Sequence, residues 1–351
     1  MPIAIDGSRL LTKNPTGVEV YCQNIINGLL VKFDDLILYT PQPISDLPKK
    51  NQQILNWPLK KFWSQIRLGF ELLIHPPTVF FSPGYVIPWL ALFNKKTKKI
   101  VTIHDLGFVY TPESYSLFQK WFLKLTTKQA VRYAHKIITA AKATKDDLIK
   151  YFNCPEEKVI VTYFGHNQDL AAHGPQFHNR KKQILFLGRI EEKKNINNLI
   201  KAFQIFYQKH PDYKLILAGK PGRGFKNFKF QISNFKFIDY KGYINQQTKI
   251  KLLQESSCLV LVSKNEGFGF PLLEAFSYNL PVLASDIQVL KEIGAAACLY
   301  AQSNSITDIA QKFEKIATDQ DLRQELIRQG QARVKDFDWQ KCVNKTWQTC
   351  F

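Results

Sequence analysis

The densest group of side chains able to do chemistry lies in residues 263–274, SKNEGFGFPLLE. Glu266 stands in a glycine-containing loop, and Glu274 follows it after seven intervening residues, one turn into a helix that we expect to begin at Pro271. The amides at a helix start bind anions, and a carboxylate such as that of Glu274 can accept hydrogen bonds from vicinal hydroxyls, as on a ribose. A plain turn with two surface glutamates is the alternative interpretation.

A second group, GRIEEKKN, occupies residues 188–195. Arg189 and one of the two lysines could neutralise a departing diphosphate without a metal ion. Taken alone, the segment is typical of an exposed basic turn. Both groups follow expected strands, so we expect them to leave the carboxyl ends of neighbouring strands and to share one crevice.

Two further polar sites have simpler explanations beside functional ones. His104, followed by Asp105, ends an expected strand, where a histidine is either functional or a hydrogen-bonded core residue. Asp336 and Asp338 form an Asp-x-Asp pair that can hold a metal ion, but Asp338 precedes a helical pattern and we interpret it as a helix cap. No metal site is expected.

The elements that must position these residues alternate between strands and helices, which predicts an α/β fold of parallel, doubly wound sheets. In the first half we expect strands at 2–6, 36–39, 79–82, 99–104, 136–140 and 159–163, and helices at 17–31, 118–134 and 143–152. The second half repeats the rhythm, with strands at 183–187, 213–218, 236–240, 258–262 and 282–285, and helices at 196–209, 246–256 and 271–278. Beyond residue 299 we expect only helices, at 305–318, 321–335 and 339–351.

This rhythm predicts two domains. The first comprises residues 1–173 with the last helix, 338–351, and the second comprises residues 181–336. Residues 169–182 show neither period and contain a Gly-Pro pair, so they are expected to form a linker.

Composition limits the function classes. Of the 351 residues, 45% are hydrophobic, which excludes a disordered or fibrous chain. The formal charge of +19 favours an anionic partner or surface, and it is spread over both halves rather than held in a nucleic-acid-binding arm. Six scattered cysteines without close pairs, and a start without a secretory signal, predict reduced thiols and a cytoplasmic location.

One uncharged stretch, residues 72–94, is long enough to span a bilayer, but prolines interrupt it, so we expect a buried strand and a loop. Lysines flank the stretch and aromatic residues are interleaved with it, a mixture that suits a face resting on anionic lipid. A core strand with solvated lysines is the alternative. The aromatic residues are Trp57, Phe62, Trp63, Phe80, Phe81 and Trp89, and the flanking cations are Lys60, Lys61, Arg67, Lys95, Lys96, Lys98 and Lys99.

The motifs in residues 188–195 and 263–274 together resemble those of the retaining GT-B glycosyltransferases of glycosyltransferase family 4. TGVEVYCQNIINGLL from Thr16, VTIHDLGFVYTPESY from Val101 and DFDW near the end extend the resemblance over nearly the whole chain. It implies a GT-B fold, in which two Rossmann-like domains face a central cleft and the C-terminal helix crosses back to the first domain.

The resemblance also implies roles for individual residues. Arg189 and Lys194 would bind the donor diphosphate, with Gly188 and, in the first domain, Gly17 close to it. Glu274 would bind the ribose, and His104 would be the active-site histidine. The transferred sugar would contact Glu266 and the amides of Gly267, Phe268, Gly269 and Phe270.

The function that we expect is transfer of a hexose, with retention, from a nucleotide diphosphate sugar to a saccharide or lipid-linked acceptor, without a cofactor. GDP-mannose is the first candidate donor, followed by a UDP-sugar. The alternatives are an NAD-dependent oxidoreductase and a non-catalytic nucleotide- or nucleic-acid-binding protein. The first lacks a Gly-x-Gly-x-x-Gly after a strand, since PGRGF at 221–225 is short and no helix is expected after it. The second leaves Glu266 and Glu274 unexplained, because carboxylates repel phosphates. No nucleic-acid partner is expected, and peripheral contact with an anionic membrane, at the inner face of the plasma membrane, stands beside the core-strand alternative.

Overall fold

A computed structural model describes residues 3–12, 15–33, 35–58, 62–166 and 180–350. The chain forms two compact units. Unit 1 comprises Met1–Leu106, Phe118–Gly165 and Asp338–Phe351, and unit 2 comprises Gly107–Leu117 and His166–Phe337.

Unit 1 is built on a seven-stranded sheet in the order β3-β2-β1-β4-β5-β6-β7, and every neighbouring pair is parallel. The order reverses direction beside β1, as in doubly wound folds. The strands are β1 (Ile3–Asp6), β2 (Leu36–Thr40), β3 (Gln52–Ile54), β4 (Val79–Ser82), β5 (Lys98–Ile103), β6 (Lys136–Thr139) and β7 (Val159–Val161). The α-helices of this half of the chain are α1 (Gly17–Lys32), α2 (Arg67–Ile74), α3 (Gly107–Tyr110), α4 (Leu117–Tyr133) and α5 (Lys142–Phe152).

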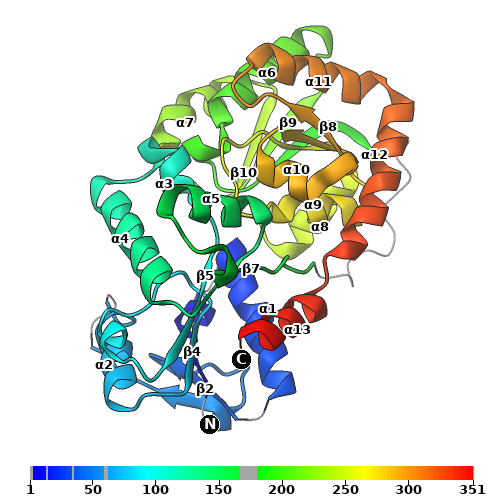
Figure 1. Ribbon diagram of the computed structural model, residues 1–351. Coiled ribbons are helices and arrows are strands. Elements are labelled where there is room, and N and C mark those ends of the chain that lie inside the picture. Colours follow the sequence, from blue (N-terminus) through cyan, green and yellow to red (C-terminus); the bar gives the residue numbers. More distant parts are fainter. Residues whose placement is uncertain (1–2, 13–14, 34, 59–61, 167–179, 351) are drawn as a thin grey trace. The chain divides into compact units, whose positions relative to one another are not determined.

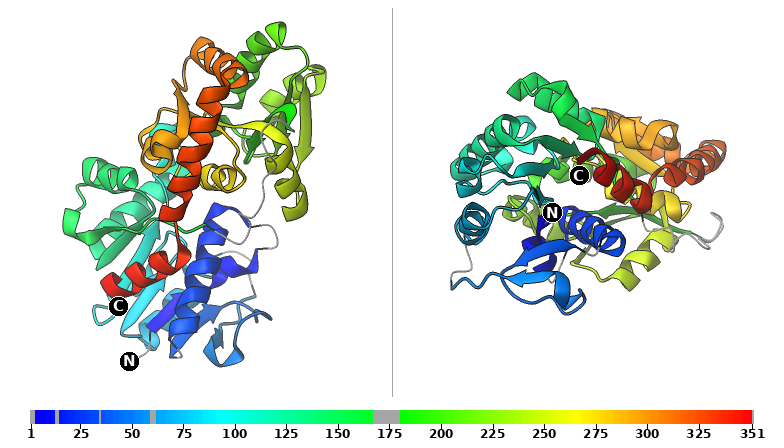
Figure 2. Two further views of the ribbon diagram at one scale, coloured as in Figure 1. Left: turned by 90° about the vertical axis from the view of Figure 1, so that its right-hand side faces the viewer. Right: turned by 60° about the horizontal axis from the view of Figure 1, so that its bottom comes forward.

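The last helix, α13 (Trp339–Cys350), lies beside α1 in unit 1 (Figures 1 and 2). The rings of Phe33 and Trp347 stack with their centroids 3.4 Å apart. Gly28 of α1 meets Val343, and a Cβ at position 28 would lie 2.4 Å from a valine methyl. The missing side chain therefore lets the two helices approach closely. The expected return of the C-terminal helix is confirmed.

Unit 2 repeats the design with six parallel strands in the order β10-β9-β8-β11-β12-β13. The strands are β8 (Lys181–Leu187), β9 (Lys214–Ala218), β10 (Ile238–Gly242), β11 (Ser256–Leu261), β12 (Val282–Ser285) and β13 (Cys298–Ala301). The helices are α6 (Ile196–Lys209), α7 (Phe225–Asn234), α8 (Gln246–Glu255), α9 (Phe270–Ser277), α10 (Gln288–Gly294), α11 (Ile306–Thr318) and α12 (Gln320–Arg333).

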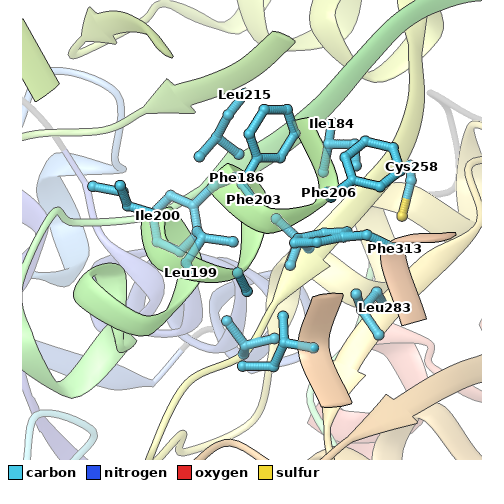
Figure 3. Packing of buried hydrophobic residues seen from close by; sticks show 14 of the residues in the cluster. Ile184, Phe186, Leu199, Ile200, Phe203, Phe206, Leu215, Cys258, Leu283 and Phe313 are labelled. Atoms are coloured by element: carbon cyan, nitrogen blue, oxygen red, sulfur yellow. The ribbon is translucent and has the colours of Figure 1, made fainter. Parts of the chain in front are cut away.

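The core of unit 2 is rich in aromatic rings (Figure 3). Phe203 and Phe206 of α6 pack against Phe313 of α11, with ring centroids 5.9 and 5.8 Å apart. These side chains lie on one side of each helix because three- and four-residue spacings share a face. The strands beneath supply aliphatic residues such as Leu215 and Leu283, so the layer fixes the helices against the sheet.

The expected α/β fold of two Rossmann-like domains is confirmed, as are the strands and helices of the two halves within a few residues. Six of the strands and α-helices were not expected: β3, α2, α3, α7, α10 and β13. The statement that no helix follows PGRGF was wrong, because α7 begins at Phe225. Its sequence, FKNFKFQISN, has phenylalanines at mixed spacings and no capping residue, which hides the helical period.

The uncharged stretch 72–94 contains the end of α2, the buried strand β4, a loop and the 3-10 turn η3 (Leu90–Phe93). The expectation of a strand and a loop is confirmed. Within the described part of the chain, no helix combines the length and the hydropathy needed to cross a membrane. Trp63, Phe80 and Phe81 are buried in the core, so these three aromatic residues agree with the alternative of a core strand rather than with a lipid-facing surface.

Of the expected linker, 169–182, residues 169–179 lie outside the described part of the chain, and residues 180–182 lie within it. At its end, the guanidinium of Arg180 donates to four carbonyl oxygens, those of Leu253, Ser256, Tyr278 and Asn279.

The expected helix cap at Asp338 is confirmed, because the Asp338 carboxylate accepts a hydrogen bond from the amide of Lys341 at 2.7 Å. The partner of Asp336 is Arg333, at 2.8 Å.

Candidate functional site

The two polar loops of unit 2 flank the point where its strand order reverses. Residues 188–195 follow β8 and residues 263–269 follow β11, and these neighbouring strands carry their connections in opposite directions along the sheet. Ligands of doubly wound sheets bind at such a point, beyond the carboxyl ends of the strands.

An ion pair joins the two loops. Lys194 Nζ lies 2.6 Å from both carboxylate oxygens of Glu266, and Ser263 Oγ donates to Oε1 of the same carboxylate at 2.7 Å. The side chains are 15% and 9% exposed. A pair this close to the interior needs additional hydrogen bonds, and Ser263 supplies one. The structure thus brings together the lysine of one predicted motif and the first glutamate of the other.

Backbone contacts hold the loops in this register. The amide of Lys264 donates to the carbonyl oxygen of Lys193 at 2.9 Å. Asn195, in the left-handed conformation with φ 60°, donates its side-chain amide to Val262 and Ser303 oxygens at 3.1 and 2.5 Å. Asparagine tolerates this conformation better than most residues. Asn195, the last residue of the basic motif, therefore fixes the position of the motif through its side-chain hydrogen bonds.

The Arg189 guanidinium has a separate position. Its side chain is 55% exposed, and Nε lies 3.7 Å from Glu191 Oε2, while Lys193 Nζ lies 3.6 Å from Oε1 of the same glutamate. Glu191 is buried, so it can orient both cations. The next loop approaches closely because position 219 is glycine: a Cβ there would lie 1.7 Å from the Gly188 carbonyl oxygen.

The helix α9 presents Glu274 on the same edge. It begins at Phe270 after Gly269, whose φ of 99° suits glycine, so Pro271 is the second helical residue rather than the first. Gly267 and Phe268 lie in the preceding loop, and the Phe268 ring is buried, 5.2 Å from the Phe270 ring. Lys249 Nζ of α8 donates to Glu274 Oε1 at 2.6 Å.

A buried histidine supports the far end of α9. His166 Nε2 lies 2.5 Å from Ser277 Oγ, and the His166 amide donates to the Phe337 carbonyl oxygen at 3.2 Å. Burial, with a smaller effect of the Lys249 charge, lowers the pKa of His166 to about 4. The imidazole is therefore neutral at pH 7.

Two predicted residues belong to unit 1. Gly17 is the first residue of α1, whose capping residue Thr16 donates its amide to Glu19 Oε2 at 2.9 Å. His104 follows β5 and is buried, and its Nε2 lies 2.9 Å from the Pro83 carbonyl oxygen. A carbonyl cannot donate, so Nε2 carries the proton and Nδ1 is the acceptor. Burial lowers the pKa of His104.

The sequence analysis gave no role to four residues that support the site: Ser263 and Asn195, which stand inside the two predicted groups, and Lys249 and His166, which lie outside them. Ser263 precedes Glu266 by three residues, a spacing that could have indicated the contact. Lys249 and His166 lie far from α9 in sequence and gave no signal. Among the side chains that the structure describes, no three of His, Cys, Asp or Glu gather closely enough to hold a metal ion.

Two family profiles match successive parts of the chain, "Glycosyltransferase Family 4" over residues 15–170 and "Glycosyl transferases group 1" over residues 169–333. The chain belongs to glycosyltransferase family 4. The Glu266–Lys194 loops lie within the second profile, and Gly17 and His104 lie within the first.

Curated relatives of this glycosyltransferase include mannosyltransferases. O-antigen chain mannosyltransferase B of Escherichia coli is 25% identical over 295 residues, which cover 80% of this chain and 76% of the relative. O-antigen chain mannosyltransferase RfbU of Salmonella typhimurium is 23% identical over 285 residues, with the same coverage of 80% and 76%.

Solved structures share the fold of the glycosyltransferase over its whole length. A sucrose-phosphate synthase from Thermosynechococcus elongatus superposes with a TM-score of 0.78 at 16% identity, covering 99% of this chain and 98% of the other. Anabaena HepE, solved with UDP-glucose, gives 0.77 at 17% identity, with 99% of each chain covered. The fold is GT-B.

Proposed function

We propose that this glycosyltransferase moves mannose, with retention of anomeric configuration, from GDP-mannose to a growing saccharide in polysaccharide synthesis. The observation that carries the proposal is the Lys194–Glu266 pair at the strand-order reversal of unit 2. The mannosyltransferase names of the relatives support the choice of sugar. The UDP-glucose bound to HepE makes a UDP-sugar the second candidate donor.

The charges of the site suit a leaving diphosphate. Lys194 and Arg189 each rest against a carboxylate, so both cations are already oriented toward the carboxyl edge. A diphosphate that arrives there gains two charge-assisted contacts, and these strengthen as the bond to the sugar breaks. Gly188, Gly17 and the amides of residues 267–270 would add neutral donors near the phosphates and the sugar.

In the proposed reaction, the bond from the sugar C1 to the diphosphate oxygen breaks and a bond from C1 to the acceptor oxygen forms on the same face. The acceptor proton passes to the departing diphosphate. Glu266 holds the sugar, Glu274 holds the ribose hydroxyls, and neutral His104 accepts a hydrogen bond from the sugar or the acceptor through Nδ1. No paired catalytic carboxylates and no metal ion take part.

The acceptor that we propose is a lipid-linked saccharide, which the enzyme meets while bound peripherally to an anionic membrane on the cytoplasmic side. The support is the positive charge of +19 and the exposed aromatic side chains of unit 1. The relatives named for O-antigen chains are consistent with a glycan acceptor.

A thermal-shift screen of GDP, UDP and their sugars tests the donor, because a ligand of the folded state raises the unfolding temperature. We expect GDP-mannose to give the largest shift. The product of the preferred donor is then examined by NMR, and an inverted anomeric centre would refute the mechanism. Turnover in EDTA tests metal independence, and a loss restored by Mg²⁺ would contradict it.

A further inference from the structure

One side of α2 in unit 1 exposes large apolar side chains. Ile66, Phe70 and Leu73 follow one another at spacings of four and three residues, which place them along one side of a helix, while Leu68 and Leu72 are buried beneath. The exposed apolar residues of this segment are Phe62, Ile66, Phe70, Leu73 and Ile74. A run of this length on a water-exposed helix indicates a contact surface.

The apolar surface continues onto η3. Gly69 of α2 lies against Leu90, since a Cβ at position 69 would be 3.2 Å from the Leu90 Cβ. The Trp89 amide donates to Gln65 Oε1 at 3.1 Å. Trp89 is exposed, and Phe93 is 77% exposed.

Aromatic residues of α4 extend the same surface. The rings of Trp89 and Phe122 lie 6.4 Å apart, and Phe118 packs 6.2 Å from both Phe122 and Trp121. Figure 1 shows α2 and α4 on one side of the unit 1 strands. We define the α2–η3–α4 face by its exposed apolar residues: Phe62, Ile66, Phe70, Leu73, Ile74, Trp89, Phe93, Phe118 and Trp121.

The chain segments that carry this face are rich in cations. Residues 47–104 contain nine cations and one acid, Glu71, which is buried and lies 2.8 Å from Arg67. The α4 sequence contains four cations and no acid. Its exposed Lys124, Lys128 and Arg132 follow Trp121 at spacings of three and four residues, so they lie on the same side of the helix.

Exposed apolar side chains together with cations favour an anionic lipid surface as the partner of this face. Aromatic rings and aliphatic chains enter the boundary between headgroups and acyl chains, and lysines reach the lipid phosphates. A second copy is disfavoured, because a two-fold interface would bring the cations of one face against those of the other. We propose that the α2–η3–α4 face docks unit 1 on anionic phospholipid. Its use, to meet a lipid-linked acceptor, rests on the proposed function; the docking does not.

The experiment is flotation of the full chain with vesicles, in low and high salt. One set of vesicles contains phosphatidylcholine with phosphatidylglycerol, and the other contains phosphatidylcholine alone. An apolar variant combines Phe70→Ser, Phe93→Ser and Trp121→Ser, and a charge variant combines Lys124→Gln and Lys128→Gln. The matched control, Ile205→Ser with Lys201→Gln, makes the same kinds of change on exposed residues of α6 in unit 2.

We expect the wild type and the control to float with the anionic vesicles only, and less in high salt. Each face variant should bind at least about tenfold more weakly, with an unchanged unfolding temperature, because each removes exposed apolar area or cationic charge. All variants should keep turnover on a soluble saccharide acceptor.

Failure of the wild type to float with anionic vesicles at low salt would overturn the docking, as would binding that neither face variant weakens. A wild type that is dimeric in solution, with a monomeric apolar variant and no vesicle binding, would assign the face to a second copy and overturn it too. Vesicle binding without turnover of any nucleotide sugar would leave the docking supported and count against the proposed function. Turnover of a nucleotide sugar without vesicle binding would support the proposed sugar transfer and overturn the docking.

Discussion

The carboxyl edges of the two sheets share a topology and differ in their chemistry. In unit 2, the loops after β8 and β11 carry cations against carboxylates, with Lys194 on Glu266 and Arg189 near Glu191. In unit 1, β1 ends in the buried Asp6, and the carbonyl oxygen of Pro83, in the loop after β4, accepts a hydrogen bond from the buried His104.

The same architecture carries two kinds of loop chemistry. A doubly wound sheet fixes where a ligand can bind, whereas the loop residues decide its charge. The cations of unit 2 fit a diphosphate, and the neutral imidazole and buried carboxyl of unit 1 fit hydroxyl groups. Burial raises the pKa of Asp6, against hydrogen bonds from Ser8 that lower it.

The largest effect is expected when both cations of unit 2 are removed. The Arg189→Ala, Lys194→Ala double variant should lower kcat/KM by at least about a hundredfold, because two contacts to the leaving diphosphate are lost. The matched control is Lys201→Ala with Lys251→Ala, two exposed lysines of the same unit. Steady-state kinetics on the preferred donor measures the effect, and undiminished turnover in a folded variant would contradict it.

The pH dependence of stability tests the buried support of α9. The folded state keeps His166 neutral down to about pH 4, whereas the unfolded chain binds a proton near pH 6.5. Stability should therefore fall with falling pH between these values, by up to about 1.4 kcal/mol per pH unit. Denaturant titrations of the wild type and His166→Gln measure this term, and identical pH slopes would contradict it.

Replacing Glu274 by glutamine separates donor binding from catalysis. The variant should bind the nucleoside diphosphate roughly tenfold more weakly, because the carboxylate that we propose as acceptor of the ribose hydroxyls is replaced by a weaker acceptor. Calorimetric titration measures this affinity. The control is Lys249→Met, which removes only the Glu274 partner. A glutamine variant that binds as tightly as the wild type would show that Glu274 is structural.

The smallest expected effect is in unit 1. Although burial opposes it, hydrogen bonds from Thr16 lower the pKa of Glu19 at the start of α1. Glu19→Gln should therefore cost about 1 kcal/mol of stability above pH 5, and the loss should shrink as Glu19 protonates in acid. Chemical denaturation at several pH values measures this loss, and a loss that stays the same size in acid would contradict the prediction.

Much of the fold followed from the pattern of the sequence. The strand and helix at Val282–Ser285 and Ile196–Lys209 have the bounds expected from hydrophobic periodicity, because buried strands are short apolar runs and buried helices repeat at three and four residues. The three-residue β3, with the sequence QQI, was not predictable in this way. Its pairing with β2 supplies the order that its composition does not.

The candidate site likewise contains residues that the sequence predicted and residues that it did not. Glu266, Glu274 and the basic motif were selected by type and spacing along the chain, whereas their partners were not. Lys249 reaches Glu274 from another helix, and His166 reaches Ser277 across 111 positions. Contacts between distant segments depend on how the layers pack, and local sequence carries no record of them.

Hydrophobic periodicity predicted the parallel sheets, and residue type predicted the charged loops that follow two of their strands. The motifs in those loops carried the resemblance to a glycosyltransferase family. The strand order, the contact of Lys194 with Glu266 and the burial of Trp63 depend on the tertiary structure. The physical reason is that periodicity tells which residues avoid water, but the neighbours that exclude the water come from elsewhere in the chain.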